Sequence, residues 1–197
     1  MPRLRQPPII NPIMKPCVLL HICCAPDSTA TFEQLAPDYE VVGFFHNDNL
    51  FPPEEYALRL ANAEKAAAAL GFTLEPCDYQ PAAWDEAVRG LESEPEKGRR
   101  CAACFRYNLT AAALRAQALG IPHFTTTLTI SPHKSSALIF EIGNEIGRTT
   151  GVEFLEIDFK KKGGFQRSLE MTRELGLYRQ NYCGCKYSLR SADARIA

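Results

Sequence analysis

Short apolar runs alternate with amphipathic segments along most of this 197-residue chain, and this alternation constrains its fold more than any other feature. The runs cover residues 17–22, 40–46, 72–77, 123–129 and 152–158. Helical patterns follow them from about residue 28 and at 53–70, 84–91, 134–150 and 165–175, with an additional one at 101–119. Strands that alternate with helices indicate a mainly parallel sheet covered on both faces. We therefore predict a doubly wound, Rossmann-like α/β fold that binds ligands at the carboxyl ends of its strands.

The composition is that of one ordinary globular domain. Hydrophobic residues make up 46% of the sequence and charged residues 23%, and no apolar run approaches the roughly 18 residues that a membrane span requires. The first 14 residues contain four prolines and lack the long apolar stretch of a secretory signal. We therefore expect a flexible leader over residues 1–14, a single α/β domain over 15–197, and a cytoplasmic protein without membrane contact.

The net charge of −1 conceals an uneven distribution of charge along the chain. Residues 33–98 contain 14 acidic and 4 basic residues, whereas residues 159–190 contain 8 basic and 2 acidic residues. A concentration of Lys and Arg is the electrostatic footprint expected for a polyanion. A solvated basic face on the last helix would give the same pattern, so charge alone leaves both explanations open.

Six of the eight cysteines occur as close pairs in the sequence. In a reducing compartment such cysteines are thiols or metal thiolates rather than disulfides. The pairs are Cys23 with Cys24, Cys101 with Cys104, and Cys183 with Cys185. We predict that all six gather at one site. Cys17 and Cys77 stand alone in apolar stretches and are expected to be small core residues outside that site.

The positions of the pairs favour a metal centre at the ligand edge of the sheet. Cys23, Cys24 and Asp27 follow the first predicted strand, and the C-x-x-C pair opens a predicted helix with both thiols on one face. Gly184 allows a tight turn between Cys183 and Cys185. A zinc ion or a four-iron cluster uses four protein ligands, which leaves two thiols and Asp27 for a second metal, a redox dithiol or substrate chemistry. A single structural zinc with spare cysteines remains an alternative.

Four blocks of sequence carry a resemblance to a known family. They are HICCAPD at 21–27, RCAACF at 100–105, DFKKKGGFQRS at 158–168 and YRQNYCGC at 178–185. In this order they resemble the signature blocks of the cobalamin-independent epoxyqueuosine reductases, the QueH family, and the likeness extends from about residue 15 to 188. The resemblance implies reduction of the epoxide of epoxyqueuosine in the anticodon loop of certain tRNAs to the alkene of queuosine. It further implies a 4Fe-4S cluster and an adjacent iron ion. We expect an electron donor that the sequence does not identify.

The same resemblance implies a fold similar to that of the adenine nucleotide alpha hydrolases. The members of that group that cleave ATP carry S-G-G-x-D-S after the first strand, whereas this chain has CCAPDS at 23–28. The two thiols and Ala25 replace the residues that cradle phosphate, so we do not expect ATP to bind.

Site residues are predicted from these blocks and from the predicted strand ends. Metal ligands are expected from the six paired cysteines and from Asp27, whose hard carboxylate beside soft thiolates would suit an open iron site. Asp27, His46 and Tyr182 are predicted to be catalytic, and Lys160, Lys161, Lys162 and Arg167 to bind tRNA phosphates. Other proton donors that we considered are Tyr178, His21, Asp48 and His133, with His21 favoured as a buried structural residue.

Two competing functions remain at this point. One is a metal-dependent tRNA-binding module or zinc protein without redox turnover. The other is a tRNA thiolase that uses ATP and a cluster, and it would need the phosphate-binding loop that CCAPDS replaces.

Overall fold

The structure is a computed structural model that describes residues 15–193, so the predicted leader over 1–14 lies outside the described residues. At its centre is a five-stranded parallel sheet in the order β3-β2-β1-β4-β5. The strands are β1 (Cys17–His21), β2 (Glu40–Phe45), β3 (Thr73–Pro76), β4 (His123–Thr126) and β5 (Glu153–Phe154). This arrangement confirms the predicted doubly wound α/β fold.

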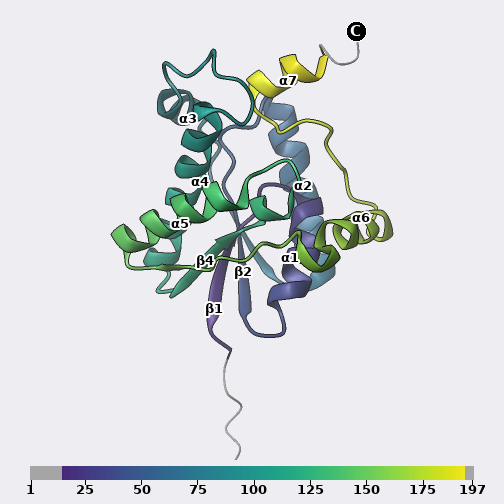
Figure 1. Cartoon of the computed structure of the whole chain (residues 1–197). Coiled ribbons are helices and arrows are strands. Elements are labelled where there is room, and N and C mark those ends of the chain that lie inside the picture. Colours follow the sequence, from purple (N-terminus) through teal and green to yellow (C-terminus); the bar gives the residue numbers. More distant parts are fainter. Residues whose placement is uncertain (1–14, 194–197) are drawn as a thin grey trace, which may run out of the picture.

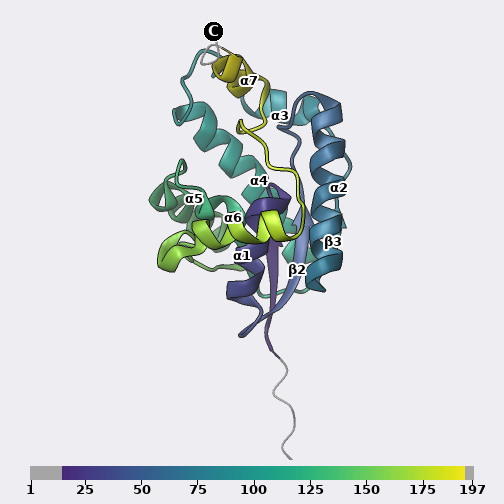
Figure 2. The same cartoon turned by 90° about the vertical axis from the view of Figure 1, so that its right-hand side faces the viewer.

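Helices cover both faces of the sheet (Figures 1 and 2). One face carries α1 (Ala25–Leu35), α2 (Pro53–Leu70) and α6 (Gly164–Glu174), and the other carries α4 (Arg99–Ala118) and α5 (Ser136–Thr150). Two short helices, α3 (Pro81–Ala87) and α7 (Lys186–Asp193), lie together beyond the carboxyl ends of the strands. None of the described helices is long and apolar enough to cross a membrane.

The apolar run that forms β1 divides its side chains between two cores. Val18 and Leu20 pack in the core under α1 and α2, whereas Leu19 packs in the core under α4 and α5. Successive side chains of a strand point to opposite faces, so a strand buried on both sides needs an unbroken apolar run. The exception is His21, which is fully buried at the end of β1.

Two predicted strands are shorter than expected. Residues 123–129 form β4 only as far as Thr126, and Thr127–Ile130 form a short 3-10 helix, η1. The Thr126 hydroxyl accepts a hydrogen bond from Leu128 N at 3.2 Å, so this side chain starts the turn where strand pairing stops. Of residues 152–158, only Glu153 and Phe154 pair as β5.

Helix boundaries also differ from the predictions. The helix expected at 84–91 lies at 81–87, because Pro81 occupies the first helical position. The helix expected from about residue 28 starts at Ala25, with Pro26 in its first turn. Helix α7 was not predicted, since eight residues are too few to give a clear helical period.

Strand β1 lies between β2 and β4. The chain adds β2 and β3 on one side of β1 and then, after a crossover, adds β4 and β5 on the other side. A doubly wound sheet opens a crevice at such a point, outside the carboxyl ends of the two strands. The loop after β1 and the turn after β4 therefore meet at this crevice. These are the segments that carry Cys23, Cys24 and η1.

Candidate metal centre

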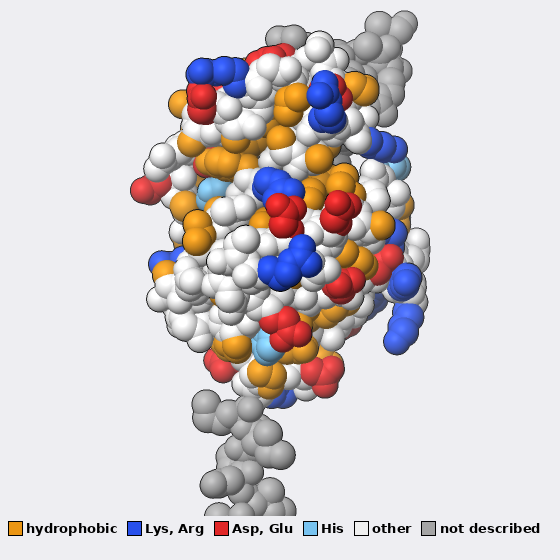
Figure 3. All heavy atoms as spheres, turned by 60° about the vertical axis from the view of Figure 1, so that its left-hand side comes forward, with side chains coloured by type: hydrophobic (Ala, Val, Ile, Leu, Met, Phe, Trp, Pro, Cys, Tyr) orange, Lys and Arg blue, Asp and Glu red, His pale blue; other side chains and the backbone are white. Residues whose placement is uncertain are grey.

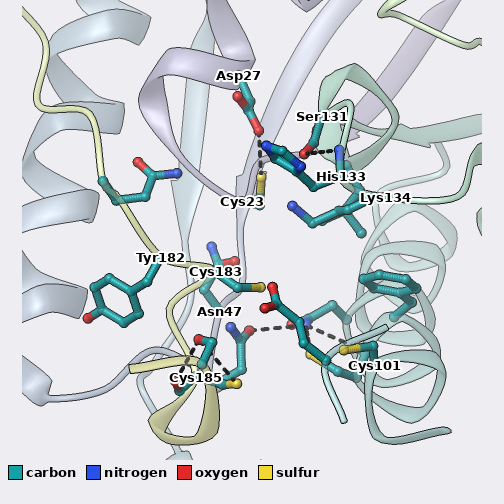
Figure 4. A pocket seen from close by; sticks show the side chains of 18 of the residues that line it. Cys23, Asp27, Asn47, Cys101, Ser131, His133, Lys134, Tyr182, Cys183 and Cys185 are labelled. Carbon is teal, nitrogen blue, oxygen red and sulfur yellow. Dashed lines mark hydrogen bonds between the residues drawn. The ribbon is translucent and has the colours of Figure 1, made fainter. Parts of the chain in front are cut away.

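A cavity of about 480 Å³ lies beyond the carboxyl ends of β1 and β4 (Figure 4). Most of its wall comes from four segments that are distant in the sequence: the loop after β1, residues 96–108, residues 128–138 and residues 179–188. Residues of β1, α2, α3 and α6 and of the loop after β2 complete it. The cysteines among its lining residues are Cys23, Cys101, Cys104, Cys183 and Cys185. Cys17 and Cys77 lie elsewhere, at the edge of the core under α4.

The first group of possible ligands consists of Cys23, Cys24 and Asp27, whose ligand atoms all lie within 4.8 Å of one another. Cys23 Sγ is 3.9 Å from Cys24 Sγ and 3.5 Å from Asp27 Oδ2. Cys24 is the N-cap of α1, and no side chain caps this helix, so Asp27 faces the thiols rather than acting as a cap. The partial positive charge of the α1 N-terminus favours anionic ligand atoms here.

Thr127 ties this loop to the turn after β4. Its hydroxyl oxygen accepts a hydrogen bond from Cys23 N at 3.1 Å and lies 3.2 Å from Cys23 Sγ. The two segments are 104 positions apart in the sequence, and the β1–β4 pairing brings them together. The thiol of Cys23 is therefore held on the cavity side of the sheet edge.

The second group consists of Cys101, Cys104, Cys183 and Cys185. The first two lie in the first two turns of α4, and the other two lie in the loop before α7. Burial raises the pKa of the Cys104 thiol, and negative charge at Cys183, Cys185 and Cys101 raises that pKa further. All four thiols line the cavity, but among the described residues only Cys23, Cys24 and Asp27 already bring three possible ligand atoms together at metal-binding distance.

Arg59 of α2 fixes the position of the loop that carries Cys183 and Cys185 through hydrogen bonds to its backbone. It is 2% exposed, and its guanidinium donates hydrogen bonds to Cys183 O at 3.1 Å and Tyr182 O at 3.3 Å while pairing with Glu55 at 2.7 Å. Gly184 sits directly against this guanidinium with φ +121°. Sequence reasoning did not identify Arg59, because nothing near residue 59 indicates a partner more than 120 positions away.

Lys134 reaches the space between the two groups (Figure 4). Burial lowers the pKa of its ammonium, but thiolate charge at Cys183 and Cys23 and the Asp27 carboxylate more than offset that effect, so the pKa lies above its ordinary value. The turn from Ser131 to Lys134 and the Ser135 N-cap of α5 fix its backbone. Sequence reasoning missed this residue. The available signal was a single lysine in the loop after the fourth predicted strand.

The sequence-predicted acids lie in different settings. His46 is buried behind the cavity wall, with Nδ1 3.0 Å from Asn108 Oδ1 and Nε2 3.5 Å from Asp48 Oδ2. Tyr182 lines the cavity, but its hydroxyl donates to Phe51 O at 2.6 Å, and burial raises its pKa to about 12. The catalytic roles of His46 and Tyr182 stay predictions.

His21 has the structural setting that we favoured. Its Nδ1 lies 2.9 Å from Thr126 Oγ1, and its Nε2 lies 3.1 Å from His46 O. Burial lowers its pKa to about 4. Both ring nitrogens thus have partners within the end of the sheet, although the ring borders the cavity.

Of the predicted RNA-binding residues, the three lysines lie between β5 and α6, and Arg167 lies in α6. Lys161 and Lys162 are exposed in the short helix η2 (Lys161–Gly163), whereas Lys160 pairs with Asp158 at 3.1 Å. Arg167 pairs with three carboxylates, those of Glu33, Glu170 and Glu174. These four residues are therefore not equivalent as phosphate ligands, and their role stays a prediction.

The residues present fit bound metal. Four sulfurs in one group suit an iron-sulfur cluster or zinc, and two sulfurs with a carboxylate suit a harder ion. Buried thiols with raised pKa values need a cation nearby to become thiolates. Trp84 Nε1 is buried beside the second group and has no hydrogen-bond acceptor within the part of the chain that is described. A thiolate that binds metal would supply that acceptor.

Replacing Gly184 by Ala should displace the loop between Cys183 and Cys185. The new Cβ would lie 2.9 Å from Arg59 Nη1 and closer still to Leu50 Cδ2, in a backbone conformation that favours glycine. We expect a loss of about 1–3 kcal/mol in the free energy of unfolding and a loss of most bound metal after anaerobic loading with iron and sulfide. The measurements are urea unfolding and metal content per chain.

Gly90→Ala is the matched control. Gly90 also has a positive φ, +80°, but nothing lies within 4 Å of its Cβ position. The Gly90→Ala variant should lose stability because of its strained backbone but should retain its bound metal. Full metal content in Gly184→Ala would show that this loop does not position ligands.

Comparison with known proteins assigns the family. The family profile described as Epoxyqueuosine reductase QueH matches residues 18–191. A protein of Streptococcus pyogenes named Epoxyqueuosine reductase QueH is 40% identical over 183 residues, which cover 90% of this chain and 72% of the relative. Proteins with the same name from Staphylococcus epidermidis and Thermotoga maritima are each 37% identical. They cover 88% and 87% of this chain and 76% and 90% of their own lengths. These matches span all six paired cysteines and the sheet that positions them, and the chain therefore belongs to the QueH family of epoxyqueuosine reductases.

Proposed function

We propose that this chain reduces the epoxide of epoxyqueuosine in tRNA to the alkene of queuosine, the last step in making that nucleoside. The reaction class follows from membership of a family of oxidoreductases. The observation that carries the proposal is the cavity itself, on which five cysteines and Asp27 converge from distant segments. A cavity of about 480 Å³ is within the size range of small-molecule sites and is large enough for a modified base.

The cofactors in this proposal are a 4Fe-4S cluster and a second iron ion. Cys101, Cys104, Cys183 and Cys185 would hold the cluster, because four soft sulfurs that line one cavity match its ligand number. Cys23, Cys24 and Asp27 would hold the second iron, since their ligand atoms lie close enough together for a single ion. The competing assignment is structural zinc, which would leave the protein colourless rather than brown.

The reaction removes one oxygen atom from the substrate. Both carbon–oxygen bonds of the epoxide break and a carbon–carbon double bond forms, while two electrons and two protons enter and water leaves. When bound, the cluster supplies electrons one at a time and the second iron supplies a Lewis acid. Lys134 contributes from the protein side, because its ammonium faces the space between the two groups and can donate a hydrogen bond to the departing oxygen.

We propose that electrons arrive from a separate donor protein and that ATP takes no part. The Cys183 side chain is exposed, so the four-cysteine group has an edge near the surface. In the loop after β1, thiols stand where an ATP-cleaving relative would have phosphate-binding residues, and Cys23 N donates to Thr127 instead of pointing at a phosphate.

The tRNA is proposed to approach beside η2 and α6. Phe165 of α6 lines the cavity, and Lys161 and Lys162 immediately precede this helix. An epoxide in an anticodon loop reaches a recessed site only if its base is splayed out and the flanking phosphates are held at the rim. On the face drawn in Figure 3, acidic and basic side chains lie next to one another, an arrangement less suited to a polyanion.

Activity and metal content of the Asp27→Ala variant test the core of the proposal. The wild-type chain, purified without oxygen, should be brown, contain iron and sulfide, and convert epoxyqueuosine in tRNA to queuosine when given a reductant. Asp27→Ala should lose at least about 100-fold in rate while keeping the absorbance of the cluster, because the carboxylate serves the second iron. Nucleoside analysis of the tRNA measures turnover.

The matched control is Asp38→Ala, which removes an exposed carboxylate in the turn after α1. It should retain normal turnover. A colourless wild-type protein that binds zinc would contradict the proposed function. Normal activity in Asp27→Ala would refute the role of that carboxylate.

Lys134→Met should lower the rate by roughly 100- to 1,000-fold, the usual cost of removing one donor that stabilises developing charge. Lys134→Arg keeps the positive charge and should retain more activity than Lys134→Met. Single-turnover rates and iron content distinguish the effects, because iron content should be preserved in both variants. Equal rates in Lys134→Met and the wild type would rule out a part for this ammonium in the reaction.

Replacing Lys160, Lys161 and Lys162 together by Ala should weaken tRNA binding and flatten its dependence on salt. Each phosphate that the variant no longer neutralises should reduce the slope of log affinity against log salt by roughly 0.7–0.9. The absorbance of the cluster should not change. Arg167→Ala is the comparator and should have a smaller effect, because its guanidinium is already paired with carboxylates. An unaltered slope in the triple variant would indicate that the tRNA phosphates bind elsewhere, and Arg99 and Arg106 near the C-x-x-C pair would be the next residues to test.

A further inference from the structure

Trp84 on α3 presents a buried donor without an acceptor. Its side chain is 2% exposed and lines the cavity, packed in the same cluster as Cys104 and Cys185. The indole Nε1 has no hydrogen-bond partner in the described part of the chain. Leaving such a group unsatisfied destabilises the folded state, and most buried polar groups in proteins are paired. The position of this N–H therefore calls for an acceptor on the sulfur side of the cavity.

Asn108 brings a second donor to the same sulfur. It is 4% exposed, and its Nδ2 lies 3.6 Å from Cys104 Sγ, 3.1 Å from Cys104 O and 3.2 Å from Asn49 Oδ1. Cys104 and Asn108 are one helical turn apart on α4, so their side chains lie on the same face.

A buried network fixes the orientation of the Asn108 amide. Its Nδ2 lies 3.1 Å from Cys104 O, which can only accept a hydrogen bond, so the amide nitrogen faces that side and Oδ1 faces His46 Nδ1 at 3.0 Å. His46 is in turn 3.5 Å from Asp48, whose carboxylate accepts a hydrogen bond from the Tyr107 hydroxyl at 2.6 Å. The amide NH₂ of Asn108 is thereby kept toward Cys104. This arrangement gives His46 a place in the site without contact with the substrate.

We infer that Trp84 and Asn108 are positioning residues that donate hydrogen bonds to the sulfur ligands at and beside Cys104 and raise the reduction potential of the centre that these sulfurs bind. The inference rests on the cluster assigned to the second group under the proposed function. Hydrogen bonds to sulfur are among the factors that set the potential of a cluster. The physical reason is charge, because reduction adds an electron that spreads onto the sulfurs, and an N–H donor stabilises the more negative state.

The sulfurs of the C-x-x-C pair receive their donors from different sources. Cys101 receives its comparable donor from the backbone, since Lys97 N lies 3.2 Å from Cys101 Sγ. The side chains of Trp84 and Asn108 are therefore the donors that substitution can remove.

The test is a redox titration of anaerobically loaded wild type, Trp84→Phe and Asn108→Leu, with iron and sulfide counted for each. Trp84→Phe keeps an aromatic ring and removes the N–H. We expect the equilibrium constant for reduction to fall about tenfold in Trp84→Phe, which is a shift of about 59 mV to more negative potential for a one-electron couple. Asn108→Leu should shift the potential in the same direction. If Asn108→Leu fails to fold because it leaves His46 without its partner, Trp84→Phe alone decides.

Val88→Ala is the matched control, because Val88 is 1% exposed in the same apolar cluster and offers no donor. The Val88→Ala variant disturbs packing but should leave the reduction potential unchanged. A fully loaded Trp84→Phe protein with the wild-type potential overturns this inference and leaves the proposed function standing. An equal shift in Val88→Ala also overturns it, since packing would then explain the effect. A wild-type chain that binds no iron and sulfide overturns the inference together with the proposed cofactor.

Discussion

Negative charge on sulfur that is held away from water must be balanced by nearby cations, and the rest of this site depends on that requirement. Burial alone raises the pKa of Cys101 and Cys104 and would keep them as neutral thiols. Arg59 and Lys134 each respond to thiolate charge at Cys24 and at Cys183, one cysteine from each ligand group. The two cations therefore balance negative charge on both sulfur groups.

The topology of the sheet explains why these groups meet at all. Parallel strands point their carboxyl ends to one edge, and the order β3-β2-β1-β4-β5 opens the crevice between β1 and β4. The loop after β1 brings Cys23 and Cys24, and the turn after β4 brings the oxygen of Thr127 that anchors them. The other four cysteines come from segments that cover this edge, where α3 and α7 lie together (Figure 2). A site made of such loops can exchange one chemistry for another while the sheet is unchanged.

The sequence predicted the parts of this structure that depend on local pattern. Unbroken apolar runs indicated the strands, and the three cysteine pairs marked the segments that line the cavity. It did not predict Arg59, Trp84, Asn108 or Lys134, because their roles arise from contacts between distant segments, such as Arg59 with the carbonyl of Cys183. It also grouped Lys160 and Arg167 with Lys161 and Lys162 as phosphate ligands. A count of charges does not show that carboxylates already pair with Lys160 and Arg167.

The two ends of the cavity differ in chemistry, and in the proposed reaction this difference orients the substrate. At one end, a carboxylate lies beside two thiols with the Lys134 ammonium nearby, an environment that favours oxygen. At the other end, four sulfurs meet N–H groups from Lys97 and Asn108, an environment that favours uptake of an electron. Epoxide reduction needs both at once, because the carbon–oxygen bonds break as electrons arrive. A substrate bound with its oxygen toward Asp27 and its carbons toward Cys104 satisfies both ends, whereas the reverse orientation would place the oxygen where sulfur offers it no hard ligand.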